Sequence, residues 1–413
     1  MFKPRLRVAI PAVALLCTPF PGIAKTFTES LSTGKAFVNE RLRYESVDDE
    51  AFDDKAEGMT IRSRVGYETA PFAGFTALIE FEDTHALGGM DDYQLPPPPT
   101  PAATGAAVIA DPEMTELNRA QLRYRGVSRL DLILGRQRLM FDNQRFIGNV
   151  GFRQDEQTFD AFSAVYTGLS DWTFSYAYVD RVYGITDVFN SDMSDNLFNV
   201  AYSGFTVGKI IAYAYNLKSE EEAPGQALVN GALKFETNET IGLRFDGGYI
   251  LPTTVPLRAI YRAEYAEQEV KLLTGQEYET EYYLAEAGIM WTFGGGSYAL
   301  TPMIGNEVLG ADDSKRAAPA SDTGLYAFQT PYATKHAFNG WVDQFLLTPN
   351  QGLNDLYFSL GFDLNAYTTK ILIQYHDYTS DVDSGPLGDE LDPGEETGVQ
   401  ILKTRGPNWT IGT

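Results

Sequence analysis

Cysteine, histidine, positive charge and long apolar runs are all scarce in this chain of 413 residues. Its one cysteine, Cys17, excludes intrachain disulfide bonds and cysteine metal clusters, and its three histidines are too widely spaced to suggest an imidazole-rich metal site. No apolar run reaches the roughly 18–20 residues of a membrane-spanning helix. The formal net charge of −24 argues against a nucleic-acid partner.

Signals of catalysis and of bound cofactors are missing as well. His85 and His376 stand beside no serine in a recognisable nucleophile motif. The glycines at 294–296 lack the lysine of a phosphate-binding loop. The acidic run at 381–392 has Pro386 where a calcium loop needs its sharp-turn glycine. The sequence therefore predicts no enzymatic activity, no cofactor and no metal site.

The N-terminus has the three parts of a secretory signal peptide. Three basic side chains in the first seven residues are followed by a short apolar segment at 8–16. Gly22 and Ala24 are small residues at the positions that signal peptidase requires. We therefore predict a signal peptide over residues 1–24, cleavage after Ala24, and an exported mature chain over 25–413.

Most of the mature chain alternates apolar and polar residues with the period of two that a half-buried β-strand requires. In the segment 256–267, for example, apolar residues alternate with Arg258, Arg262 and Glu264. Sixteen complete segments of this kind lie at 35–45, 58–69, 73–83, 113–125, 129–137, 158–167, 171–182, 197–204, 207–217, 239–250, 256–267, 279–292, 297–306, 355–365, 368–378 and 397–405. A seventeenth segment begins at Trp409.

Short and long connections alternate strictly between these segments, which is typical of an outer-membrane barrel with short periplasmic turns and long external loops. Strands of about 9–11 residues also suit a tilted bilayer crossing. We therefore predict an all-β fold, a transmembrane antiparallel up-and-down β-barrel in the bacterial outer membrane. Because such barrels have an even strand number and this chain stops in mid-strand, we expect about eighteen strands in the complete protein. A sixteen-stranded barrel and a soluble β-sandwich are the alternatives.

Several stretches resemble the family of bacterial outer-membrane proteins that carry an alginate-export domain. The longest is 135–160, which begins Gly135-Arg-Gln-Arg, and the others are 39–45, 74–82, 336–343 and 352–355. The resemblance implies an eighteen-stranded barrel whose arginine-rich pore passes an anionic polysaccharide. Outer-membrane lipid and lipopolysaccharide would then be its surroundings.

Arginines are unusually frequent at the positions that strand parity directs toward the interior. They are Arg41, Arg43, Arg62, Arg64, Arg119, Arg123, Arg125, Arg244, Arg258 and Arg262. A guanidinium group stays charged and binds carboxylates through two hydrogen bonds, and arginines that line a water-filled pore select anions. We therefore predict a passive channel for anionic solutes, such as alginate-like uronic-acid polysaccharide or oligosaccharides.

Three other interpretations stay open. The arginines can pair with glutamates across the lumen and stiffen the wall. The protein can be a general or sugar-selective porin, in which the arginines create an electric field across the pore that is not specific to one solute. It can also be a barrel-anchored surface scaffold or adhesin that displays the acidic loops.

A second set of arginines is harder to place. Parity would point Arg136 and Arg138 at lipid, where an arginine at mid-bilayer costs about 2–4 kcal/mol. They therefore lie at the rim, where they can hold lipopolysaccharide phosphates, or a bulge turns them inward to join Arg145 and Arg153 at a constriction. The long loop at 84–112, rich in proline and small residues, is predicted to form a partial lid or an external flap.

Overall fold

A computed structural model describes residues 26–48, 54–93, 95, 105–186, 190–220, 235–312, 326–341, 343, 345–382, 395–403 and 409–412. The predicted signal peptide, 1–24, lies outside them. A short helix, α1 (Phe27–Ser32), precedes the strands. The strands are β1 (Lys35–Val47), β2 (Ala56–Glu68), β3 (Phe75–Asp92), β4 (Met114–Tyr124), β5 (Leu130–Gln137), β6 (Thr158–Tyr166), β7 (Trp172–Tyr183), β8 (Ser191–Phe205), β9 (Gly208–Lys218), β10 (Phe235–Ile250), β11 (Leu257–Leu272), β12 (Glu277–Phe293), β13 (Tyr298–Leu309), β14 (Leu353–Leu364), β15 (Thr369–Thr379), β16 (Glu395–Lys403) and β17 (Trp409–Gly412).

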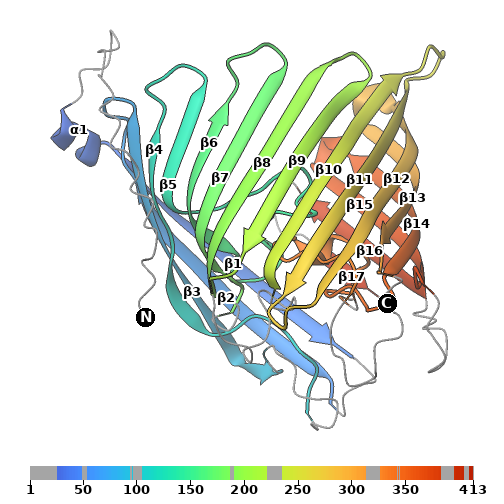
Figure 1. Ribbon diagram of the computed structural model, residues 1–413, viewed down its shortest axis with the longest axis horizontal. Helices are drawn as coiled ribbons and strands as arrows, with labels where there is room; N and C mark the ends of the chain where they lie inside the picture. Colours follow the sequence, from blue (N-terminus) through green and yellow to red (C-terminus); the bar gives the residue numbers. More distant parts are fainter. Residues whose placement is uncertain are drawn as a thin grey trace.

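Each strand from β2 to β16 pairs antiparallel with the strand before it and the strand after it in the sequence, and β1 and β17 are the two ends of this 17-stranded sheet. Figure 1 shows this sheet as a curved wall whose strands follow one another in chain order. The predicted all-β, up-and-down antiparallel architecture is therefore confirmed. No pairing of β17 with β1 is present among the described strands, so closure into a barrel and a total of eighteen strands stay predictions. No helix in the described part of the chain is long and apolar enough to cross a membrane.

The sheet carries its apolar side chains on the outer face. Along β2, the buried positions Thr60, Arg62 and Arg64 alternate with more exposed positions such as Ile61 and Val65, as the period of a strand requires. Large apolar residues such as Leu243, which is 54% exposed, face outward, whereas polar residues such as Thr60 and Thr84 are buried inside. This polarity is the reverse of that of a water-soluble sheet, in which the apolar face is covered.

Two chain segments fold back into the space that the sheet encloses. We call residues 138–157, between β5 and β6, the first inner segment, and the described residues of 326–352, before β14, the second inner segment. Phe146 of the first packs on Phe328 of the second and on Tyr282 of β12, with ring centroids 5.8 Å and 5.3 Å apart. The sequence predicts polar external loops here. The structure differs because these segments carry aromatic side chains that are buried against one wall of the sheet.

Candidate functional site

The first inner segment touches strands that lie far apart in the sheet. Gln154 Nε2 donates to Thr60 Oγ1 of β2 over 2.8 Å. Arg145 Nε lies 2.7 Å from Glu307 Oε1 of β13. Since one segment reaches both strands, the sheet curves around it and the interior is narrowed. We call the region where residues 149–157 meet β1 to β4 the constriction.

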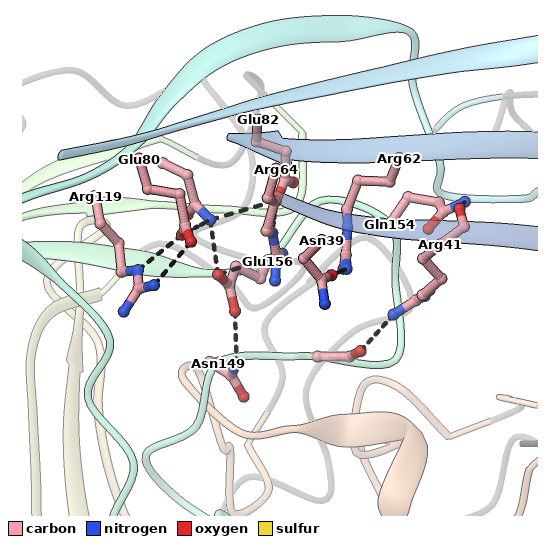
Figure 2. A network of polar contacts seen from close by, with 12 residues as sticks. Asn39, Arg41, Arg62, Arg64, Glu80, Glu82, Arg119, Asn149, Gln154 and Glu156 are labelled. Atoms are coloured by element: carbon pink, nitrogen blue, oxygen red, sulfur yellow. Dashed lines mark hydrogen bonds and ion pairs between the residues drawn. The ribbon is translucent and has the colours of Figure 1, made fainter. Parts of the chain in front are cut away.

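Three guanidinium groups and three carboxylates form an ion-pair network at the constriction, much of which Figure 2 shows. Its members are Arg64, Arg119, Arg138, Glu80, Glu82 and Glu156. Arg119 Nε and Nη2 lie 2.7 Å and 2.8 Å from the two oxygens of Glu80. Arg138 Nε donates to Glu156 over 2.7 Å, and Arg64 binds both Glu82 and Glu156. The carboxylates are no more than 2% exposed, so the positive charges of this network are cancelled inside the protein.

A β-bulge brings Asn118 into this network beside Arg119. Glu80 pairs with Arg119 across β3 and β4, but the next residue, Phe81, pairs with Leu117, so Asn118 is the extra residue. The side chain of Asn118 is fully buried and donates hydrogen bonds into the same network. The bulge therefore directs two consecutive polar side chains toward the interior.

Arg41 and Arg62 differ from the arginines of the network, because neither has a carboxylate within 4 Å among the described residues. They stand directly opposite each other across β1 and β2. Arg41 Nη1 donates to the carbonyl oxygen of Gly151 over 2.9 Å, and its Nη2 donates to that of Phe152. Arg62 Nη2 donates to Asn39 Oδ1 over 2.5 Å, while its buried Nε has no hydrogen-bond partner. Two adjacent guanidinium groups at the constriction (Figure 2) therefore lack a direct ion pair, and the carboxylates that act on them, Glu82 and Glu156 for Arg62 and Asp111 for Arg41, do so from a longer distance.

The aromatic ring of Phe152 lies between two cationic or ionisable groups. Arg43 Cζ lies 4.0 Å from its centroid, and the His336 ring of the second inner segment stacks on it at 3.3 Å. His336 Nδ1 lies 2.8 Å from Asp343 Oδ1. Burial disfavours the charge of Asp343, but the contact with His336 and the charges of Arg153 and Arg43 together outweigh it and leave the pKa of this carboxyl below its usual value. Sequence reasoning missed the role of Phe152, because a partner almost two hundred residues away leaves no local signal.

Most of the other arginines predicted to face the lumen are paired with acids. Arg123 and Arg125 share Asp131, beside the short connection between β4 and β5. Arg244 and Arg262 both lie within 3.0 Å of Asp246, and each has a further glutamate partner. Arg43 pairs with Glu45 and Asp111, whereas Arg258 is exposed. For the paired residues the geometry fits a stiffened wall as well as a charged one, and their place on a solute path stays a prediction.

The four arginines of the predicted constriction lie in three different places: the wall, the contact with β13, and the constriction itself. Arg136 stays on the wall, where its Nε lies 3.1 Å from Asp160 and its guanidinium lies 3.4 Å from the Tyr183 ring centroid. Arg138 follows the end of β5 and turns inward to the network. Arg145 is buried at Glu307 and ties the first inner segment to β13.

Arg153 belongs to the constriction itself. It lies 3.0 Å from Glu45 of β1 and 3.1 Å from Asp343 of the second inner segment. Burial disfavours its charge, but the carboxylates around it, Glu45 first among them, raise its pKa further above the ordinary arginine value. Arg153 therefore remains charged and joins three parts of the chain.

Both ends of the predicted lid, 84–112, can be placed. Its first part continues β3 as far as Asp92. Its last part packs inside, where Ile109 is 1% exposed and Asp111 Oδ1 accepts a hydrogen bond from the backbone N–H of Gln154 over 2.9 Å. The prolines at 96–101 lie outside the described residues, so the predicted lid stays a prediction.

The fold is similar to that of solved outer-membrane proteins, one of which is a BenF-like porin. The chain is similar to the Pseudomonas aeruginosa outer-membrane protein OpdK solved with vanillate, at 12% identity and a TM-score of 0.59, over 92% of this chain and 93% of that one. It is similar to Pseudomonas aeruginosa OpdL, at 13% identity and 0.57, over 92% and 99%. A BenF-like porin from Pseudomonas fluorescens Pf-5 matches at 12% and 0.58, over 93% and 94%. No family model and no curated protein sequence matches the chain.

These comparisons correct the resemblance to alginate-export proteins, which was wrong. The structures that match over nine tenths of the chain are porins and outer-membrane proteins of another kind, and no family model supports the resemblance. The stretch 135–160 that carried it consists of the end of β5, the first inner segment and the start of β6. Its glycines, arginines and acids serve the bend and the ion-pair network of that segment, and they do not identify a cargo.

Proposed function

We propose that this protein is a channel of the bacterial outer membrane through which small solutes diffuse passively. Two features support the proposal. The fold matches that of porins over more than nine tenths of the chain. The sheet presents apolar side chains outward and polar ones inward, which suits a wall between lipid and a water-filled interior.

We further propose that the channel prefers solutes that carry a carboxylate group. The observation that carries this is the Arg41–Arg62 pair, whose guanidinium groups have no carboxylate within 4 Å among the described residues. A directly opposed pair on antiparallel strands has its Cα atoms about 4.5–5.5 Å apart, so a single carboxylate can meet both guanidinium groups. The OpdK structure with vanillate, an aromatic carboxylate, supports this solute class.

The size of the solute follows from the inner segments. They pack through an apolar cluster on β8 to β12 that includes aromatic side chains of β9 and β12, and this cluster holds them on that side of the interior. Their contacts with β1 to β4 at the constriction are mainly polar. Water or a polar solute can replace such contacts when a solute passes. The solute path therefore runs along the arginine side of the interior and admits small molecules.

The test is single-channel recording in planar bilayers, with benzoate as the probe solute. We expect Arg41→Gln with Arg62→Gln to remove the preference for anions in the reversal potential and to weaken block by benzoate about tenfold or more. The reason is that hydrogen bonds to charged groups contribute about 1.5–3 kcal/mol. The double lysine variant keeps both charges, so it should keep the anion preference while block weakens, because lysine has no bidentate fork.

The matched control is Arg123→Gln with Arg125→Gln, which removes the same charge from two arginines already neutralised in part by Asp131. We expect a smaller effect on both readouts. If the Arg41 and Arg62 glutamine variant keeps the original reversal potential and benzoate block, the carboxylate preference is wrong, although a general porin would remain.

A further inference from the structure

Asp155, in the first inner segment, is a fully buried acid without a cation of its own. Its exposed fraction is 0%, and neither of its carboxylate oxygens receives a hydrogen bond from a donor group. Its carboxyl group is within hydrogen-bond reach of Glu82 on β3, and Glu82 Oε1 is likewise buried without a donor. Two buried carboxyl groups that meet in this way can both be satisfied by one shared proton.

No cation forms an ion pair with Asp155 among the described residues. The acids that face it are Glu82 of β3, Glu116 of β4 and the adjacent Glu156, and the nearby cations are Arg62 and Arg64 of β2 and Arg138. Arg64 and Arg138 are already bound to glutamates of the ion-pair network, and Arg62 acts on Glu82 and Glu156 without a direct ion pair. Burial first, and then the surrounding negative charges, raise the pKa of Asp155 well above its ordinary value.

A metal ion is a poorer explanation than a proton. No group of three or more acidic, histidine or cysteine side chains in the described part of the chain is arranged to hold a metal ion. An ionised, unpaired carboxylate in this setting would be strongly unfavourable. Protonation removes the charge and at the same time supplies the missing donor.

We propose that Asp155 is protonated in this structure, donates its proton in a hydrogen bond to Glu82, and so forms a latch that fastens the first inner segment to the wall and opens on deprotonation. The flanking residues also hold the segment to the wall, and the bond between Asp155 and Glu82 is the contact of this group that depends on a proton. Gln154 is bonded to β2 and Glu156 to Arg138 and Arg64. Ionised Asp155 would place a second negative charge beside Glu82, which already stands opposite Glu116 across the strands.

The sign of the pH dependence follows from linkage. A loosened segment exposes Asp155 to water and returns its pKa to the ordinary value of about 3.9, whereas the latched form holds the pKa higher. The latched form is therefore fully favoured below the ordinary value. Between the ordinary and the raised pKa, the ratio of loosened to latched molecules rises by up to about tenfold per pH unit, and above the raised pKa it stays constant.

Infrared spectroscopy of the whole protein in detergent tests the proton directly and does not depend on the proposed function. We expect the wild-type protein at neutral pH to show the C=O stretch of a protonated carboxyl group that Asp155→Asn lacks. The control Asp171→Asn changes an exposed acid in the short connection between β6 and β7, and it should keep the band. In the difference spectrum of wild type minus Asp155→Asn, which cancels the bands of other buried acids such as Asp195, this band should also vanish reversibly as the pH is raised.

A wild-type spectrum identical to that of Asp155→Asn would mean that Asp155 is ionised and would overturn the proposal. The same conclusion would follow if sodium or calcium, but not pH, changed the carboxylate bands, since a cation would then occupy the place of the proton.

Single-channel recording tests the latch and rests on the proposed function. We expect current fluctuations of the wild type to increase as the pH rises, whereas Asp155→Asn, whose amide donates to Glu82 at every pH, should stay quiet. If the infrared band disappears at high pH but the current shows no pH-dependent fluctuation, Asp155 is protonated as proposed, but its deprotonation does not loosen the first inner segment. Channels that conduct nothing at any pH would contradict the proposed function and leave the infrared result standing.

Discussion

At the residue scale, the sequence predicts which way a side chain points but not whether its charge is free. Arg62 and Arg64 lie two apart on β2 and share one face, as their parity predicts. Yet Arg64 is bound to Glu82 and Glu156, while Arg62 is bound to Asn39. Part of the difference comes from strand register, since Glu82 of β3 stands opposite Arg64 and Thr84 stands opposite Arg62. The other part comes from Glu156, which is distant in sequence and arrives only because the first inner segment folds inside. No pattern local to β2 carries that information.

Arg145 gives a prediction at the same scale, because it is a buried charge whose partner is also buried. The side chains of Arg145 and Glu307 are 3% and 5% exposed. Removing one member of such a pair costs about 3–5 kcal/mol, because the other charge is left uncompensated. We expect Arg145→Met to increase hydrogen exchange of both inner segments by about a hundredfold or more, measured by mass spectrometry.

The double variant Arg145→Met with Glu307→Met removes both charges, and it should recover much of the lost protection. Protection in Arg145→Met equal to that of the wild type would show that this ion pair does not hold the segment.

At the element scale, the period of two located nearly every strand. The predicted segments 35–45, 113–125 and 368–378 agree closely with β1, β4 and β15. The period of two does not predict that the inner segments are buried, because an irregular stretch of chain has no regular alternation of apolar and polar residues. The composition of the second inner segment does indicate burial, because an external loop has no need of closely spaced large aromatic residues such as Tyr326, Phe328 and Tyr332.

Gly135 gives the prediction at this scale, since it shapes the end of β5 from which the first inner segment departs. Its φ is +110°, and a Cβ built there would lie 2.3 Å from the carbonyl oxygen of Ala120 on β4. We expect Gly135→Ala to weaken the pairing of β4 with β5 and to lower the free energy of unfolding in urea. Gly275→Ala is the control, because its φ of +83° is similar but no atom lies within 4 Å of the new Cβ.

The control should lose about 1–2 kcal/mol from backbone strain alone. Gly135→Ala should lose clearly more, because the clash with Ala120 adds to the same strain. Equal losses in the two variants would mean that β5 shifts to accept the side chain and that the close approach of the strands is not required.

At the scale of the whole molecule, the fold class follows from sequence and the cargo does not. Alternation and connection length describe the wall, and they predicted an up-and-down sheet that matches porins in three dimensions. The alginate-export resemblance failed because it rested on segments that build the constriction. Similar turns, glycines and ion pairs are needed to fold a segment inside a curved sheet whatever solute passes it.

The outward apolar face gives the last prediction, which concerns the surroundings of the whole protein. Leu243 lies in the middle of β10 and is 54% exposed. If the face lies in lipid, Leu243→Arg should lower the free energy of unfolding from phospholipid vesicles by about 2–4 kcal/mol, the amount expected for an arginine near the bilayer midplane. Thr254→Arg, in the exposed connection between β10 and β11, adds the same side chain outside the apolar band, and it should change stability by less than about 1 kcal/mol. Urea titration of protein refolded into vesicles measures both. An equally small effect of the two substitutions would mean that the outer face of β10 is in contact with water, and the placement of the protein in a membrane would then have to be abandoned.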